Sequence, residues 1–137
     1  MDIGVVDGQG GGVGRAIITA LRERLPEANI IALGTNAVAT AAMLRAGANE
    51  GATGENAIVV TAPRCNLLLG PIGLVLANAM LGEVTPRIAE AIGSSTTMKI
   101  LIPIQKANVR VAGLENASLP ALISQAVEMA AAFAENA

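Results

Sequence analysis

The chain is organised around Val5-Val6-Asp7-Gly8-Gln9-Gly10-Gly11-Gly12-Val13-Gly14-Arg15-Ala16-Ile17. The apolar residues 3–6 predict a buried strand, and apolar side chains recur at helical spacing after the glycines. Glycine lets a backbone turn sharply and approach a ligand closely. The start of a helix offers unpaired N–H groups to an anion. A strand, a glycine loop and a helix in this order therefore predict a site for a phosphorylated ligand.

The spacing Gly8-x-x-x-Gly12-x-Gly14, followed by Arg15-Ala16, resembles the loop of the short-chain dehydrogenase/reductase family. In that family the loop carries the pyrophosphate of a nicotinamide cofactor, so the resemblance implies NADP or NAD. It covers only the first strand and helix. The family also relies on a Tyr-x-x-x-Lys pair, which a chain without tyrosine cannot supply. The resemblance therefore leaves open whether the protein is an enzyme.

Two other glycine loops have a similar composition. Residues 10–16 resemble the deviant P-loop of partition-type ATPases, but such a loop needs Lys followed by Ser or Thr. Arg15 and Ala16 occupy those places. Tubulin-like GTPases use a Gly-Gly-Gly-x-Gly loop, although deep in the chain rather than after the first strand. An ATP or GTP binder stays open as an alternative, as does a glycine turn that binds nothing.

The composition bounds the size and the chemistry of the protein. A chain of 137 residues, with 53% apolar and 15% charged residues, predicts one compact domain over residues 1–137. The absence of histidine excludes a metal site built on His and a Ser-His-Asp triad. Phe133 is the only aromatic residue, and the net charge is −2 without a basic run, so we expect no nucleic-acid partner.

The single cysteine, Cys65, cannot form an internal disulfide, and no signal peptide is visible. Both features predict a cytoplasmic protein, with Cys65 as a core residue. Residues 65–82 carry no charge and approach the length of a membrane span, about 20 residues. Because glycine, proline and asparagine interrupt this run, we predict a buried strand, a tight loop and a buried helix there, and no membrane span.

Strand and helix patterns alternate along the whole chain. This alternation predicts an α/β fold with a doubly wound, mainly parallel sheet and helices on both faces, which is a Rossmann-like architecture. Residues 57–62 favour a strand by propensity, but the alternation favours a helix, which we expect. The expected strands cover residues 3–6, 29–33, 48–53, 66–69, 99–104 and 109–114. The expected helices cover residues 12–25, 37–46, 57–62, 74–81 and 85–92, with a last helix capped by Ser118 that buries Leu122, Ile123, Val127, Met129 and Phe133.

Ligands of such sheets bind at the carboxyl ends of the strands. An acidic residue after the second strand would bind the ribose of NAD, but Gly34-Thr35-Asn36 provides none. With Arg15 close to the loop, a 2′-phosphate, as in NADP, fits better, unless Thr35 and Asn36 only cap the next helix. The predicted cofactor-binding residues are Gly8, Gln9, Gly10, Gly11, Gly12, Val13, Gly14, Arg15, Thr35, Asn36, Gly70, Pro71, Ile72 and Gly73.

Three side chains at this edge are candidates for chemistry. Lys106 is the only lysine expected there and is a candidate acid, base or phosphate contact. Asp7 either holds a ligand or, as we favour, orders the loop through backbone N–H groups. Glu55 is either a site group or a first-turn residue that suits the helix dipole. No metal site is predicted.

The expected helix over residues 74–81 is apolar nearly all round. A helix buries only one stripe against a sheet, so the rest would form an exposed apolar patch. We therefore predict a homodimer or a larger homo-oligomer, with Asn78 and Glu83 pairing across the interface rather than touching a ligand. The alternative is that the later helices cover this one fully.

Four segments beyond any single loop resemble a family of short bacterial proteins, the domain of unknown function 3842. These segments are residues 7–12, 34–36, 51–57 and 70–73, and the resemblance spans nearly the whole chain. It implies no particular activity. The residues therefore predict a protein that binds a nucleotide or dinucleotide at the glycine loop, with NADP or NAD favoured. A module that senses a nucleotide without turning it over is the alternative.

Overall fold

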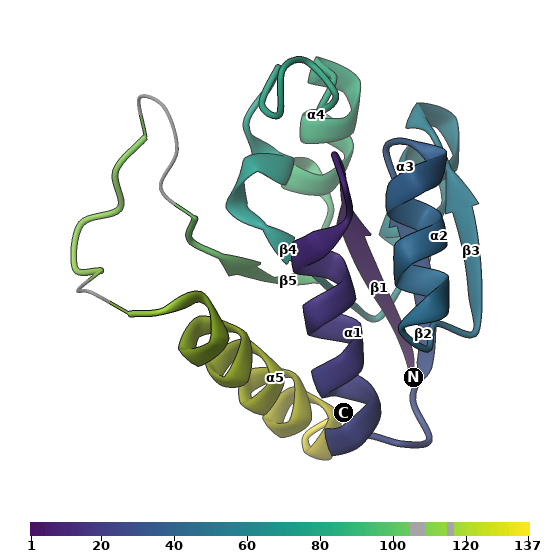
Figure 1. Ribbon diagram of the computed structural model, residues 1–137, viewed down its shortest axis with the longest axis vertical. Helices are drawn as coiled ribbons and strands as arrows, with labels where there is room; N and C mark the ends of the chain where they lie inside the picture. Colours follow the sequence, from purple (N-terminus) through teal and green to yellow (C-terminus); the bar gives the residue numbers. More distant parts are fainter. Residues whose placement is uncertain (105–108, 115–116) are drawn as a thin grey trace.

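In the computed structural model, which describes residues 1–104, 109–114 and 117–137, parallel strands form one sheet with helices on both faces (Figure 1). The strands are β1 (Asp2–Asp7), β2 (Asn29–Gly34), β3 (Glu50–Thr53), β4 (Leu67–Pro71) and β5 (Met98–Ile102). The helices are α1 (Gly12–Arg24), α2 (Ala37–Arg45), α3 (Glu55–Thr61), α4 (Pro86–Ser94) and α5 (Leu119–Glu135). Two short 3-10 turns, η1 (Ala62–Arg64) and η2 (Ile72–Val75), flank β4.

The sheet has the strand order β3-β2-β1-β4-β5, and every pair is parallel. β1 is central, so Ile3 lies between Ile30 of β2 and Leu67 of β4. Its burial on both faces explains why its sequence is an uninterrupted apolar run. The strand order changes direction between β1 and β4, which is the switch point where sheets of this kind open a crevice. The predicted doubly wound parallel α/β fold is confirmed.

Alternate residues of the central strands supply two cores. Val5 points to the face covered by α1, α2 and α5, where it packs with Ile17 and Val127. Val6 points to the face covered by α3 and α4, where it packs with Ile58. Figure 1 shows α5 lying alongside α1 on the first face. Each large side chain buried in this way contributes about 1.5–3 kcal/mol relative to its exposed state.

Side-chain caps fix where several helices begin. The side-chain oxygen of Asn36 accepts from the N–H of Ala39 at the start of α2. Thr85 and Ser118 cap α4 and α5 in the same way. α3 covers the segment for which propensity and alternation disagreed, so the expected helix is confirmed. A helix there returns the chain from β3 at one edge of the sheet to β4 beyond β1.

The helix expected over residues 74–81 is wrong. η2 is followed by turns, and Met80, Leu81 and Gly82 have φ angles of 58°, 56° and 92°. A right-handed helix needs negative φ at every residue, so the backbone cannot continue as one. Residues 74–81 are mostly apolar although they form a short 3-10 turn and further turns at the sheet edge rather than a helix. Within the described part of the chain, no helix is long and apolar enough to cross a membrane.

This correction removes the premise of the predicted apolar interface. Leu74 is buried in the second core, whereas Leu81 is fully exposed on a turn. Asn78 and Glu83 both hydrogen bond within the chain, and their expected pairing across an interface lacks the helix that would present them. The homodimer remains a prediction, but the apolar helix on which it was based does not exist.

Two further expectations differ from the structure. Residues 109–114 form no strand, and the sheet of the described residues ends at β5. Pro103 follows β5 directly and cannot donate to a sheet ladder, and Gly113 with a φ of 85° sits in a turn. Met129, expected in the core, is 57% exposed, because the sheet lies on the opposite side of α5. Leu122 and Phe133 are partly buried as they pack on that core.

Cys65 is buried in the second core, as predicted. Burial raises the pKa of its thiol to about 11, and the nearby carboxylate of Asp2 adds to the shift. The thiol is therefore protonated at neutral pH and acts as a small apolar side chain.

Candidate functional site

The carboxyl ends of β1, β2 and β4 bring most of the predicted site residues to one edge of the sheet. The glycine loop (residues 8–14) follows β1, Thr35 and Asn36 follow β2, and Gly70 to Gly73 end β4 and begin η2. The main chain ties the first two ends together, because the N–H of Thr35 donates to the carbonyl of Asp7 at 3.0 Å. This edge includes the switch point between β1 and β4.

Asp7 organises the glycine loop from inside the fold. Its side chain is buried, and its two carboxylate oxygens accept from the N–H groups of Gly8 at 2.8 Å and Gly14 at 2.7 Å. One residue at the end of β1 therefore fixes both ends of the loop and the start of α1. These are the backbone hydrogen bonds that the loop-ordering role of Asp7 predicts.

The five glycines of the loop fall into two kinds. A Cβ added at Gly8, Gly11 or Gly14 would come within 3.0 Å of neighbouring atoms, and Gly11 also has a φ of 74°. These three are required by the fold. A Cβ at Gly10 or Gly12 would meet nothing within 4 Å, and neither residue has a positive φ. The fold does not require glycine at these two positions, and both face open space.

Unpaired backbone donors lie at the same two glycines. The N–H of Gly11 donates to the carbonyl of Gly8, which closes a tight turn. Within the described part of the chain, the N–H groups of Gly10, Gly12 and Val13 have no hydrogen-bond acceptor. Two of these donors belong to the first turn of α1, where the helix dipole adds partial positive charge. Such an arrangement is suited to a phosphate or another anion.

A cavity of about 690 Å³ opens beside the loop, between the ends of β1, β4 and β5. Its polar lining among the described residues is Asp7, Gln9 and Asn78, and the rest is apolar. Most of the apolar wall comes from the β4–α4 connection (residues 72–85), and Val13 faces it from α1. The apolar lining residues are Val13, Pro71, Ile72, Gly73, Val75, Leu76, Ala77, Ala79, Met80, Leu81, Ile104 and Val109. The cavity therefore joins a loop with unpaired N–H donors to a mostly apolar wall.

Glu83 is a site residue whose role the sequence analysis missed. It ends the turns after η2, and its Oε1 accepts from Gln9 N–H at 2.8 Å, Thr35 Oγ1 at 2.6 Å and Asn36 Nδ2 at 2.8 Å. The hydrogen bonds from Thr35 and from Gln9 hold the pKa of Glu83 below its ordinary value. The carboxylate therefore lies at the end of β2, although β2 itself provides no acid. Glu83 is the only charged residue between Arg64 and Arg87, which is a signal that the sequence offers.

Arg15 and Glu55 lie apart from this cluster, whereas Asn36 belongs to it. Arg15 lies on the exposed side of α1. Glu55, at the start of α3, forms an ion pair with Arg87 of α4 at 3.5 Å. Asn36 caps α2 with its oxygen, and its nitrogen also donates to the carbonyl of Gln9 at 2.9 Å. Lys106 lies outside the described residues.

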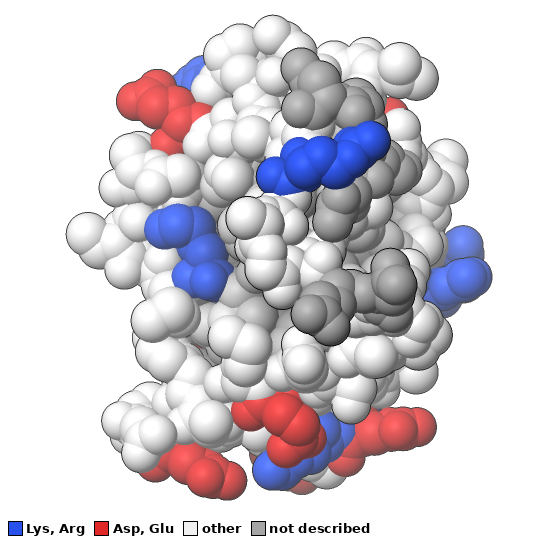
Figure 2. Space-filling model, turned by 90° about the vertical axis from the view of Figure 1, so that its left-hand side faces the viewer, with Lys and Arg blue, Asp and Glu red and all other residues white. Residues whose placement is uncertain are grey.

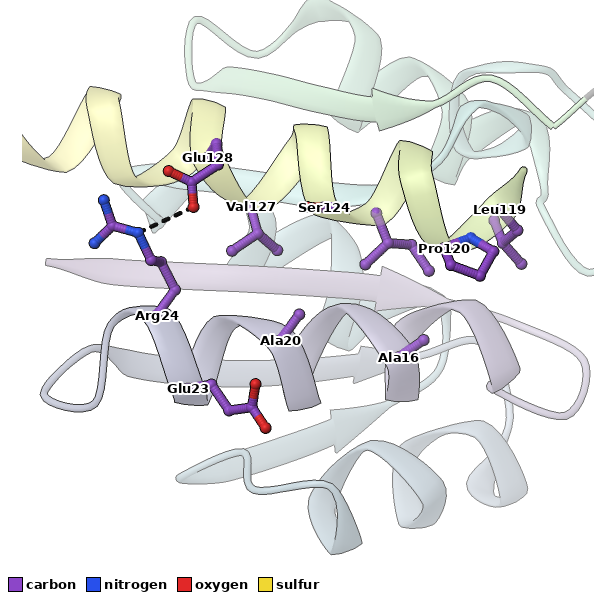
Figure 3. A pocket seen from close by; sticks show the side chains of 10 residues that line it. Ala16, Ala20, Glu23, Arg24, Leu119, Pro120, Ser124, Val127 and Glu128 are labelled. Carbon is purple, nitrogen blue, oxygen red and sulfur yellow. Dashed lines mark hydrogen bonds and ion pairs between the residues drawn. The ribbon is translucent and has the colours of Figure 1, made fainter. Parts of the chain in front are cut away.

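A second cavity, of about 580 Å³, lies between α1 and α5 (Figure 3). Small side chains, among them Ala16 and Ala20 of α1 and Ser124 of α5, line it. Figure 3 shows the ion pair of Arg24 and Glu128 at one end of it, with an N–O distance of 3.0 Å. Regular helix on both sides leaves no backbone N–H group to face a ligand along most of its length. We regard this space as a groove between packed helices.

Most of the described surface on the side drawn in Figure 2 is uncharged. Described carboxylates gather toward its two ends, and basic side chains are seen over its middle. The described charges in the middle of this side would not repel an anionic ligand.

A parallel sheet in this strand order, with a glycine loop between its first strand and helix, defines a Rossmann-like α/β protein. The chain belongs to the family described as domain of unknown function (DUF3842), whose model matches residues 2–135. No curated protein matches the chain significantly. A solved structure with which it shares similarity is a dodecameric FMN-dependent Ubix-like decarboxylase from Escherichia coli O157:H7. That similarity has 16% identity and a TM-score of 0.49, and covers 97% of this chain and 75% of the other.

Proposed function

We propose that this chain binds a nucleotide, with a phosphate group on residues 8–13 and the remainder in the cavity at the switch point. One observation carries the proposal. Gly10 and Gly12 are glycine where neither φ nor neighbouring atoms require it, and the N–H groups of Gly10, Gly12 and Val13 lack an acceptor among the described residues. A phosphate would occupy the space that side chains leave open and would accept from these donors.

A nicotinamide dinucleotide, NAD or NADP, is the first candidate ligand. The site follows the first strand of a doubly wound sheet, which is where such cofactors place their pyrophosphate. The volume of about 690 Å³ lies within the range of small-molecule sites, roughly 300–1,000 Å³. Among the described residues of its lining, Asp7 alone is ionisable, and loop N–H groups occupy both its oxygens. These features favour binding, as in a sensing module, and any hydride chemistry would be that of the cofactor.

A P-loop-type ATP or GTP binder is less well supported. The residue that should reach magnesium is Ala16, whose side chain lines the groove toward α5 and not the cavity beside the loop (Figure 3). Arg15, in the place of the lysine, is exposed on the side of α1.

Calorimetric titration with NADH, NADPH, ATP and GTP, the last two with magnesium, tests the proposal. We expect heat with at least one dinucleotide. In Gly12→Val, the valine side chain fills the open space over the loop, so we expect affinity to fall at least about tenfold, or 1.4 kcal/mol. Heat with ATP and magnesium alone would favour the P-loop alternative.

Gly93→Val is the matched control. Gly93 lies in the last turn of α4, is exposed, and also has nothing within 4 Å of an added Cβ. Both variants should keep the far-UV circular dichroism of the parent, because valine is no worse than glycine in a helix. Binding that survives Gly12→Val unchanged, or no heat with any of the four nucleotides, would contradict the proposal.

Self-association and location are separate proposals. The exposed apolar side chains include Leu81, Val60 and Met129, which lie on different elements. We propose a homodimer, for which light scattering at low micromolar concentration is decisive, since a mass near 13.7 kDa shows a monomer. A cytoplasmic location likewise stays a prediction, based on the single, buried cysteine.

A further inference from the structure

Glu83 places a negative charge at the end of β2, at the point where a dinucleotide would carry its adenosine ribose. The carboxylate comes from the β4–α4 connection, 74 residues away from Gln9, whose N–H it accepts. Three donors on two loops hold Oε1, so the charge is fixed in position. Within the described part of the chain, Oε2 accepts no hydrogen bond.

Three donors near this end of β2 are already used. The N–H of Gln9, the hydroxyl of Thr35 and the side-chain amide of Asn36 all donate to Glu83. Their donation also keeps Glu83 ionised, because it lowers the pKa of the carboxyl. Among the described residues, no ion pair brings a cation to this carboxylate: Arg87 pairs with Glu55, and Arg15 forms no described ion pair with Glu83.

A 2′-phosphate carries close to two negative charges at pH 7. Placed beside a fixed carboxylate, it would be repelled, whereas a ribose hydroxyl can donate to the open Oε2. The sequence analysis favoured NADP because no acidic residue follows β2. In the structure, Glu83 from the β4–α4 connection places an acidic side chain there.

From this geometry we infer that Glu83 sets the selectivity of the site: it accepts a ligand with free ribose hydroxyls and excludes one with a phosphate at the same place. The inference rests on the proposed function, because it concerns the same site. It names NAD, and nucleotides with an unmodified ribose, as the ligand class.

Calorimetry with NADH and NADPH tests the inference, because the two ligands differ only in the 2′-phosphate. We expect the native protein to bind NADH at least about tenfold more tightly. Glu83→Gln keeps an acceptor oxygen for the two loops and removes the charge, so the ratio should fall to about threefold or less. Glu83→Ala also frees the three donors for a phosphate, so the preference should move further toward NADPH.

Glu27→Gln is the control for net charge, since Glu27 is exposed in the turn before β2, at the opposite edge of the sheet. It should leave the ratio unchanged. If Glu83 only held the loops together, its variants would weaken both ligands equally and keep the ratio, which overturns the inference. Equal binding of NADH and NADPH by the native protein overturns it without any variant and leaves the proposed function standing. If neither dinucleotide binds but ATP or GTP does, the inference is overturned and nucleotide binding stands, whereas no heat with any of the four nucleotides overturns both.

Discussion

The β1–α1 loop and the β4–α4 connection cross the same edge of the sheet but are held in different ways. The loop is fixed by its own neighbour, Asp7, which accepts from the N–H groups of Gly8 and Gly14. The connection folds on itself, with the N–H of Asn78 donating to the carbonyl of Val84 at 2.7 Å, and reaches the loop through Glu83. The site thus combines a part built locally with a part that depends on the whole sheet.

The largest effect should come from the loop. In Gly11→Ala, an added Cβ lies 2.9 Å from the backbone of Ala39, at a φ of 74°. We expect unfolding in urea to show a loss of roughly 2–5 kcal/mol. Gly12→Ala, at an open position in the same loop, should be unchanged or more stable by up to about 1 kcal/mol. Equal stability of the two variants would contradict the division of the loop glycines into those that the fold requires and those that it does not.

A smaller effect should come from the connection, and it should depend on pH. The pKa of Glu83 is lowered in the folded state, so its stabilisation is present above the ordinary carboxyl pKa of about 4.3 and is lost as the pH falls through the folded-state pKa. Glu83→Gln should cost about 1 kcal/mol at pH 7 and make stability less dependent on pH in this acid range. Urea titrations between pH 3 and 7 measure both, beside Glu27→Gln, which should follow the parent curve.

The smallest effect should come from the tip of the connection. Leu81 is fully exposed and has a φ of 56°, so its side chain contributes no packing and its backbone is strained. In Leu81→Gly, relief of that strain is offset by the greater freedom of glycine in the unfolded chain, and the change should be within about 0.5 kcal/mol. A loss above 1 kcal/mol would show that the tip, and not only Glu83, holds the connection in place.

The two regions also differ in how far the sequence predicts them. The loop is local: a strand, clustered glycines and a helix stand side by side in the chain, so its conformation and the role of Asp7 could be predicted. The connection has a helix-like composition, and only a contact with residues far away in sequence shows that it is not a helix. Glu83 was missed as a site residue for that reason, since neither spacing nor propensity indicates that it reaches β2.

The strand elements follow the same division. Strands β1, β2, β4 and β5 were predicted because each contains an apolar run. β3, with the sequence Glu-Gly-Ala-Thr, was expected in spite of its poor strand propensity. The prediction of a sixth strand was wrong. Residues 109–114 have strand propensity, but they do not pair with either edge of the sheet. Propensity reports how a segment could pair, whereas the sheet decides whether it does.

The pairing of β1 with β4 has a consequence for the order in which the chain folds. Pairing β1 with β2 joins Asp2 to Asn29, whereas pairing β1 with β4 joins Ile3 to Leu67. The second pairing closes a longer loop and therefore costs more chain entropy. β1, β2 and β3 can therefore associate first, and β4 docks later with its connection. The glycine loop exists as soon as α1 packs on β1, but its apolar wall and Glu83 arrive only with this last step. A chain that folded in this order would form the proposed phosphate-binding loop before Glu83, the proposed selectivity residue, reached it.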